Sequence, residues 1–123
     1  MRLLTLLSVM LLVTTMVCAA SAQGPDMAPK HSIKEVMIQA HKPPANLLRK
    51  TAQGKASAAE KQKLLELYRS LAEHKPGKGS AESWAEKTGL LVSAAEAAVN
   101  GDADAPAKLT KASSCAGCHK IHK

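Results

Sequence analysis

The residues best suited to chemistry lie near the C-terminus, in the order Cys115-Ala116-Gly117-Cys118-His119. The spacing C-x-x-C-H is the attachment motif for c-type haem. Two thiols add across the two vinyl groups of the porphyrin, and the histidine after the second cysteine binds the iron as the proximal ligand. Ala116 and Gly117 are small enough for the backbone to approach the porphyrin edge. The motif predicts one covalent haem c, with Cys115 and Cys118 as thioether donors and His119 on the iron.

Two other uses of these cysteines are weighed against haem attachment. A thioredoxin-like redox pair is expected near a βαβ pattern, which the sequence lacks. A zinc ion could recruit the same three side chains together with His122. One predicted helix cannot easily wrap four ligands that lie within eight residues around a tetrahedral ion. Haem attachment is therefore favoured over both.

The first 22 residues have the order of a secretory signal peptide. Arg2 supplies the charge, an apolar run covers residues 3–17, and Ala20-Ser21-Ala22 is a small-residue cleavage site. Cleavage would remove Cys18 and leave two cysteines in an oxidising compartment. We expect a periplasmic or otherwise exported protein without stable membrane insertion after cleavage. Retention of the segment as an anchor stays open, because it is just long enough to span a bilayer.

The composition suits one small helical domain. Of the 123 residues, 46% are hydrophobic and 22% are charged, which is a globular balance. Aromatic residues make up only 2%, with no Phe, so the core must be aliphatic or must surround something that is not protein. The net charge of +7 points to acidic partners. Nucleic acid is not expected, because basic and aromatic residues are not interleaved.

Helix start signals follow a flexible lead-in over residues 23–31. A capping box formed by Ser32 and Glu35 starts the first helix. Pro43-Pro44 must stop or kink that helix, because proline lacks the N–H and disfavours α geometry in the residue before it. A second capping box over residues 57–60 starts the second helix.

The second half of the chain predicts two more helices. Ser80 caps the third, which ends at Asn100-Gly101. Asp104 caps a fourth that runs almost to the C-terminus, with Pro106 tolerated in its first turn. No segment alternates like a strand. Residues 32–123 are therefore predicted to form one all-α domain, an up-down-up-down four-helix bundle with one covalently bound haem near the C-terminal end.

A C-x-x-C-H motif that closes the chain resembles the class II cytochromes c, which comprise the cytochrome c prime group and its low-spin four-helix-bundle relatives. The resemblance covers about Ser32 to Lys123 and is motif-specific only at Cys115, Cys118 and His119. The sequence departs from the family at Pro43-Pro44, where a continuous first helix is expected. The resemblance implies an electron carrier, not an enzyme. Its partners would be redox proteins that are acidic at the contact surface, and a homodimer stays open.

Topology and the resemblance indicate the residue opposite His119 on the iron. In such a bundle the first and fourth helices are adjacent and antiparallel, so the start of the first helix lies level with His119. Met37 lies at that height, and low-spin members of the resembled family place a methionine of this helix on the iron. Met37 is the expected sixth ligand. His41, one turn further along the same face, is the alternative, and an open sixth position is a third.

The leading functional hypothesis is an electron carrier, since two protein ligands keep the iron six-coordinate in both oxidation states. The alternative is a five-coordinate haem protein that binds nitric oxide or carbon monoxide beside Ile33, Val36 and Met37. A small peroxidase is less favoured, because only His41 could serve as a distal acid–base group. The remaining histidines are expected on the solvated surface: His31, His74 and His122.

Overall fold

The structure is a computed structural model that describes residues 28–123, and every regular element in this part of the chain is helical. The expected all-α class is confirmed for these residues. The signal peptide expected over residues 1–22, and the part of the lead-in over residues 23–27, lie outside the described residues. None of the described helices combines the length and the apolar character that a membrane crossing requires.

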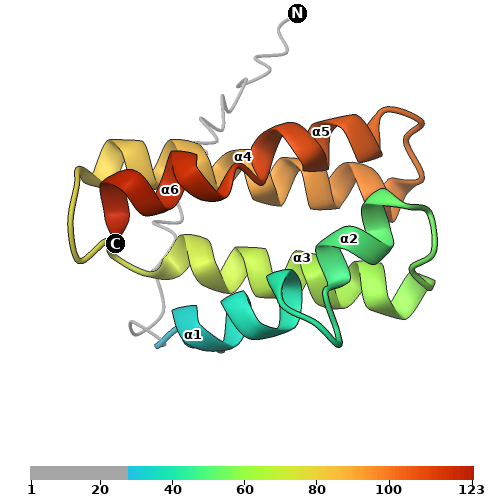
Figure 1. Cartoon of the computed structure of the whole chain (residues 1–123), viewed down its shortest axis with the longest axis horizontal. Helices are drawn as coiled ribbons and strands as arrows, with labels where there is room; N and C mark the ends of the chain where they lie inside the picture. Colours follow the sequence, from blue (N-terminus) through green and yellow to red (C-terminus); the bar gives the residue numbers. More distant parts are fainter. Residues whose placement is uncertain (1–27) are drawn as a thin grey trace, which may run out of the picture.

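Two long helices form the centre of the fold (Figure 1). The first, α3 (Ala58–Glu73), starts at the predicted capping box, with both reciprocal hydrogen bonds between Ser57 and Glu60 present. The second, α4 (Ala81–Asn100), starts at Ser80 and ends before Gly101, whose φ of 77° is the left-handed geometry that favours glycine. A short turn joins the two helices, which run antiparallel and make the most extensive interhelical contact of the described chain.

An N-terminal arm of short helices runs along α3 (Figure 1). Its first helix starts at the predicted capping box of Ser32 and Glu35. The helix widens into a turn of π-helix and stops at Lys42, before Pro43-Pro44, as the prolines predict. Asn46 then caps a further short helix. The elements are α1 (Ile33–Val36), η1 (Met37–His41) and α2 (Leu47–Ala52).

The C-terminal arm, which runs along α4, contains two helices where one was predicted. These are α5 (Ala105–Ala112) and α6 (Cys115–His122). The expected continuous helix is wrong because Ser114 adopts an extended conformation, and its side chain accepts a hydrogen bond from the N–H of Gly117. Serine hydroxyls compete for backbone groups in this way and favour caps over helix interiors. Asp104 precedes α5 as predicted, but its side chain makes no capping bond.

The apolar core is concentrated on α3, α4 and the helices that pack on them. Burial of one leucine side chain contributes about 1.5–3 kcal/mol. α4 alone buries seven residues, whereas α6 buries none. α5 packs closely on α4, and α2 packs on both α3 and α5. The largest fully buried side chains are Tyr68, Leu64, Leu67, Leu109, Val36 and Thr88.

Candidate cofactor site

The C-x-x-C-H motif occupies the first turns of α6, the least covered helix of the structure. Cys115 and His119 are exposed, Cys118 is half-buried, and both cysteines are free thiols. A spacing of four residues places Cys115 and His119 on one face of the helix. Among the described helices, the most extensive contact of α6 is a sparse one with α4. The two thiols and the imidazole are therefore accessible along one side of a helix that no protein core covers.

Burial governs the electrostatics of the Cys118 thiol. Burial raises the pKa of this thiol, Lys87 opposes that shift, and the charge of Cys115 adds to it. A redox nucleophile needs a stabilised thiolate, and this environment does not provide one at Cys118. Within residues 28–123, no three or more His, Cys, Asp or Glu side chains gather in a group that could hold a metal ion.

The imidazole of His41 lies within electrostatic reach of His119. Burial lowers the pKa of His41, and the charge of His119 lowers it further. Nε2 of His41 is buried and has no hydrogen-bond partner among the described residues. An unsatisfied buried polar atom costs about 1–3 kcal/mol, so such atoms are rare and call for an explanation. A group from outside the chain that binds this nitrogen would supply one.

Two further buried polar atoms lack partners in the described chain, namely the Tyr68 hydroxyl and Nε1 of Trp84. The centres of the Tyr68 and His41 rings are 5.8 Å apart. Burial raises the pKa of the Tyr68 hydroxyl, and the charge of Cys115 makes a smaller contribution in the same direction. Each of the three side chains with an unpartnered atom therefore interacts with a residue of α6. His119 acts on the pKa of His41 and Cys115 on the pKa of Tyr68, both after burial, whereas Trp84 packs directly against the His122 ring.

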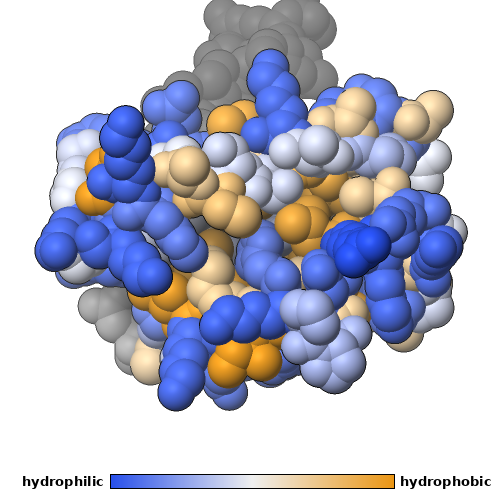
Figure 2. All heavy atoms as spheres, in the orientation of Figure 1, coloured by the Kyte–Doolittle hydropathy of each residue, from blue (hydrophilic) through white to orange (hydrophobic). Residues whose placement is uncertain are grey.

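Figure 2 shows the face of the molecule that carries α6 and α1. Apolar surface is visible in the middle of this face, between hydrophilic side chains of the upper and lower arms. In the same view, Figure 1 shows α6 in the C-terminal arm at the top and α1 in the N-terminal arm at the bottom.

The local conformation of η1 explains the position of His41. A π-helical turn is wider than an α-helical one and often occurs at functional sites. His41 is the last residue of η1, and Lys42 leaves the helix in an extended conformation just before Pro43-Pro44. The proline pair signals the end of the helix, but no sequence pattern indicates the π turn. Met37, the predicted sixth ligand, is the first residue of η1 and is partly buried against the apolar core.

The expectation that His122 lies on the solvated surface is met only in part, because the ring is half-exposed but bonded to the protein. Its Nδ1 donates a hydrogen bond to the carbonyl of Lys78 (2.8 Å), and its Nε2 accepts one from the Ser83 hydroxyl (3.1 Å). The ring also packs edge-on against Trp84, with ring centres 5.3 Å apart. Sequence reasoning missed these contacts because the partners lie about 40 residues earlier in the chain.

His31 and His74 are also bonded rather than solvated. Nε2 of His31 is 2.7 Å from Oε1 of Glu66, and Nε2 of His74 donates to the carbonyl of His31 (2.8 Å). The Ser70 hydroxyl binds both the N–H (2.8 Å) and the carbonyl (3.0 Å) of His31. Together these bonds tie the end of the lead-in to α3.

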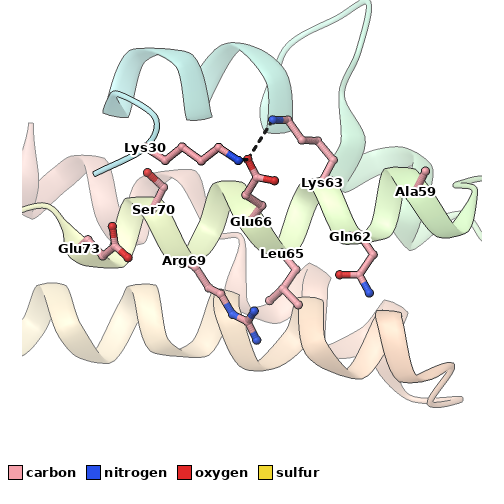
Figure 3. A pocket seen from close by; sticks show the side chains of 9 residues that line it. All are labelled: Lys30, Ala59, Gln62, Lys63, Leu65, Glu66, Arg69, Ser70 and Glu73. Carbon is pink, nitrogen blue, oxygen red and sulfur yellow. Dashed lines mark hydrogen bonds and ion pairs between the residues drawn. The ribbon is translucent and has the colours of Figure 1, made fainter. Parts of the chain in front are cut away.

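A pocket on the outer side of α3 lies beside this anchor, away from the motif (Figure 3). Lys30 and Lys63 both pair with Oε1 of Glu66, at 2.9 and 3.3 Å. These pairs and His31 lower the pKa of Glu66 to about 2. Glu66 thus gathers the charged groups at this end of the pocket, and the lining includes neither cysteine of the motif. The lining residues are Lys30, Ala59, Gln62, Lys63, Leu65, Glu66, Arg69, Ser70 and Glu73.

A scan against protein-family models finds no match for this chain, and searches of curated proteins and of solved structures find none either. The resemblance to class II cytochromes c remains a prediction from the motif and the helix pattern.

Proposed function

We propose that this chain is an exported single-haem c-type cytochrome that carries electrons. Cys115 and Cys118 hold haem c through thioethers, His119 is the proximal iron ligand, and His41 is the sixth ligand. The observation that carries the proposal is the buried, unpartnered Nε2 of His41, on an imidazole that interacts electrostatically with His119. A neutral imidazole nitrogen with a free lone pair is a common iron ligand.

The residues around the motif fit a haem on chemical grounds. The thiols lie on a helix that buries no residue of its own, so a flat apolar group can cover it without displacing a protein core. The hydroxyl of Tyr68 and Nε1 of Trp84 are donors that protein groups leave unused. In this proposal the N-terminal arm, α3, α4 and the C-terminal arm are the four limbs of an up-down-up-down bundle, and the haem completes the side between η1 and α6.

The choice of His41 over Met37 rests on burial and pairing. The resemblance favours Met37, but a methionine that is partly buried against the core is already accounted for as a packing residue. The nitrogen of His41 is buried and unpartnered, and the lowered pKa keeps it in the neutral form that binds iron. Two histidine ligands would give a lower reduction potential than a histidine and a methionine.

When bound, haem supplies a one-electron couple between ferric and ferrous iron. His41 and His119 would hold the iron from the protein side, and two fixed protein ligands would limit reorganisation during electron transfer. The buried side chains of α3 and α4 exclude water from the inner side of the site. Cys115, which is exposed, marks the side from which a partner protein can approach.

The surface beside the motif suits an acidic redox partner. Residues 105–123 include no acidic residue, and they include four exposed lysines. Lys87 of α4 adds a positive charge near Cys118. A positive surface around an electron-transfer edge steers an acidic protein toward it, and salt weakens this attraction. The four lysines are Lys108, Lys111, Lys120 and Lys123.

The proposal is tested by the intact mass of the mature protein purified from the periplasm of a host that assembles c-type cytochromes. The expected mass is that of the polypeptide after removal of residues 1–22 plus one haem, and the haem should resist extraction by acidic acetone. The Cys115→Ala, Cys118→Ala double variant is the matched control and should retain no covalent haem. A native protein with the mass of the polypeptide alone, or with bound zinc, would overturn the proposal.

A further inference from the structure

The last turn of α6 is fastened to the turn between α3 and α4 by a single side chain. The His122 ring donates from Nδ1 to the Lys78 carbonyl and accepts at Nε2 from the Ser83 hydroxyl. It also packs nearly perpendicular to the Trp84 ring, at an interplanar angle of 82°. Both ring nitrogens and one ring edge are therefore engaged by residues 78–84.

The turn leaves space for this ring by having glycine at position 79. A Cβ atom on Gly79 would lie 2.7 Å from Cε1 and Nδ1 of His122, and 2.9 Å from Cγ2 of Ile121. Such distances are too short for non-bonded carbon and nitrogen atoms. The backbone of the turn can therefore lie against α6 only because residue 79 has no side chain.

We infer that His122 is a positioning residue that latches α6 to the framework of α3 and α4. The His122 latch is His122 with Lys78, Gly79, Ser83 and Trp84. α6 buries no residue and touches α4 only sparsely, so burial contributes little to holding it. The latch fixes the helix at one end, one turn beyond His119. Its effect on the iron rests on the proposed function, whereas the latch itself rests only on these contacts.

The latch is tested by amide hydrogen exchange of the purified mature chain, with His122→Ala compared with Lys120→Ala. Lys120 is exposed on the same helix and controls for a shortened side chain. Loss of both hydrogen bonds of His122 should speed exchange of the α6 amides by roughly tenfold or more, while exchange in α3 stays unchanged. His122→Asn, whose amide can still donate to the Lys78 carbonyl, should recover part of the protection.

The fluorescence of Trp84 provides a second readout, because it is the only tryptophan of the chain. When His122 leaves its ring edge, Trp84 gains contact with water and its emission shifts to the red. Unchanged α6 exchange together with unchanged Trp84 emission in His122→Ala would overturn the latch.

A glycine pair tests the same contact from the opposite side. Gly79 and Gly101 have similar positive φ angles of 80° and 77°, but a Cβ on Gly101 would meet no atom within 4 Å. Backbone strain in Gly79→Ala and Gly101→Ala should therefore be similar. Only Gly79→Ala should push His122 aside and speed exchange in α6. Equal α6 exchange in the two variants would show that His122 is not held by the turn, contrary to the proposal.

These readouts separate the latch from the proposed function. Exchange can be measured whether or not the chain carries haem, whereas Trp84 emission is measured on the haem-free chain, because haem quenches tryptophan fluorescence. A chain without haem would therefore contradict the cytochrome while still testing the latch. In haem-loaded protein, His122→Ala should also shift the reduction potential, because His119 loses its fixed position, and His122→Asn should shift it less. A changed potential with unchanged α6 exchange would contradict positioning through the helix.

Discussion

α4 and α6 both begin at a serine cap, yet they are held in opposite ways. α4 buries seven residues and is fixed by the core, whereas α6 buries none and is fixed by His122 and by the group that its cysteines would carry. The contrast separates a framework of α3, α4 and α5 from a chemical face of η1 and α6. Substitutions in the framework should change the stability of the protein and leave its visible spectrum unchanged. Substitutions in the chemical face should change the spectrum and leave the stability unchanged, except where they remove haem.

Loss of the attachment residues is expected to have the largest effect. The Cys115→Ala, Cys118→Ala variant should lose covalent haem, and its Tm should fall by on the order of 20 °C, because a group that binds only the native state stabilises it. Circular dichroism during heating measures the change. Cooperative unfolding at the temperature of the native protein would contradict a structural role for haem.

His41→Ala should produce the next largest effect, confined to the spectrum. Without the second imidazole, the haem should change completely from low spin to high spin and bind carbon monoxide in the ferrous form. Met37→Ala, in the same η1 element, is the matched control and should stay low spin. If Met37→Ala becomes high spin while His41→Ala does not, methionine is the ligand, as the resemblance predicts.

The framework half of the comparison is tested by a core truncation. Leu67 on α3 is fully buried, so Leu67→Ala should lower the free energy of unfolding by about 2–5 kcal/mol. Ile121→Ala on α6, whose side chain is 44% exposed, should change it by less than about 0.5 kcal/mol. Urea unfolding measures both. Similar losses in the two variants would remove the distinction between framework and chemical face.

The smallest expected effect belongs to Glu66, which ties the lead-in to α3. Hydrogen bonds from His31, Lys30 and Lys63 lower the pKa of its carboxyl from 4.5 to about 2. As the pH falls, Glu66 therefore takes up a proton near pH 4.5 in the unfolded chain but only near pH 2 in the folded chain. The pairing is present above pH 4.5 and is lost as the pH falls through this window.

Glu66→Gln should accordingly cost about 1 kcal/mol at pH 7, because the groups are partly exposed and screened. The difference between the variant and the native protein should disappear near pH 2. Urea unfolding at pH 7 and near pH 2 checks both points. A difference that persists at the lower pH would mean that the carboxylate charge is not its cause.

Local signals predicted most helix boundaries. The capping boxes at Ser32 and Ser57, the stop at Pro43-Pro44 and the end at Gly101 all agree with the structure. Each depends on a hydrogen bond or a dihedral preference that spans only a few residues. Such interactions are readable in the sequence because their partners are close in the chain.

The predictions that were wrong or met only in part fall into two groups. In one, a side chain competes with the helix for backbone hydrogen bonds, and in the other the contacting residues are far apart in the chain. The break at Ser114 came from a serine that caps a new helix within an otherwise helical pattern. The contacts of His122 with Lys78 and Ser83, and of His31 with Glu66, join residues that are far apart in the chain. The motif itself was readable because covalent attachment requires a fixed short spacing. The effect of His119 on the pKa of His41 depends on the tertiary fold.

The most direct test of the central claim is one pair of visible spectra, from the oxidised and reduced protein, followed by addition of carbon monoxide to the reduced form. A covalent haem held between His119 and His41 predicts low-spin spectra in both states and negligible binding of carbon monoxide. High-spin spectra with rapid binding of carbon monoxide would contradict the carrier and favour the gas-binding alternative. The absence of haem absorbance would contradict the whole account.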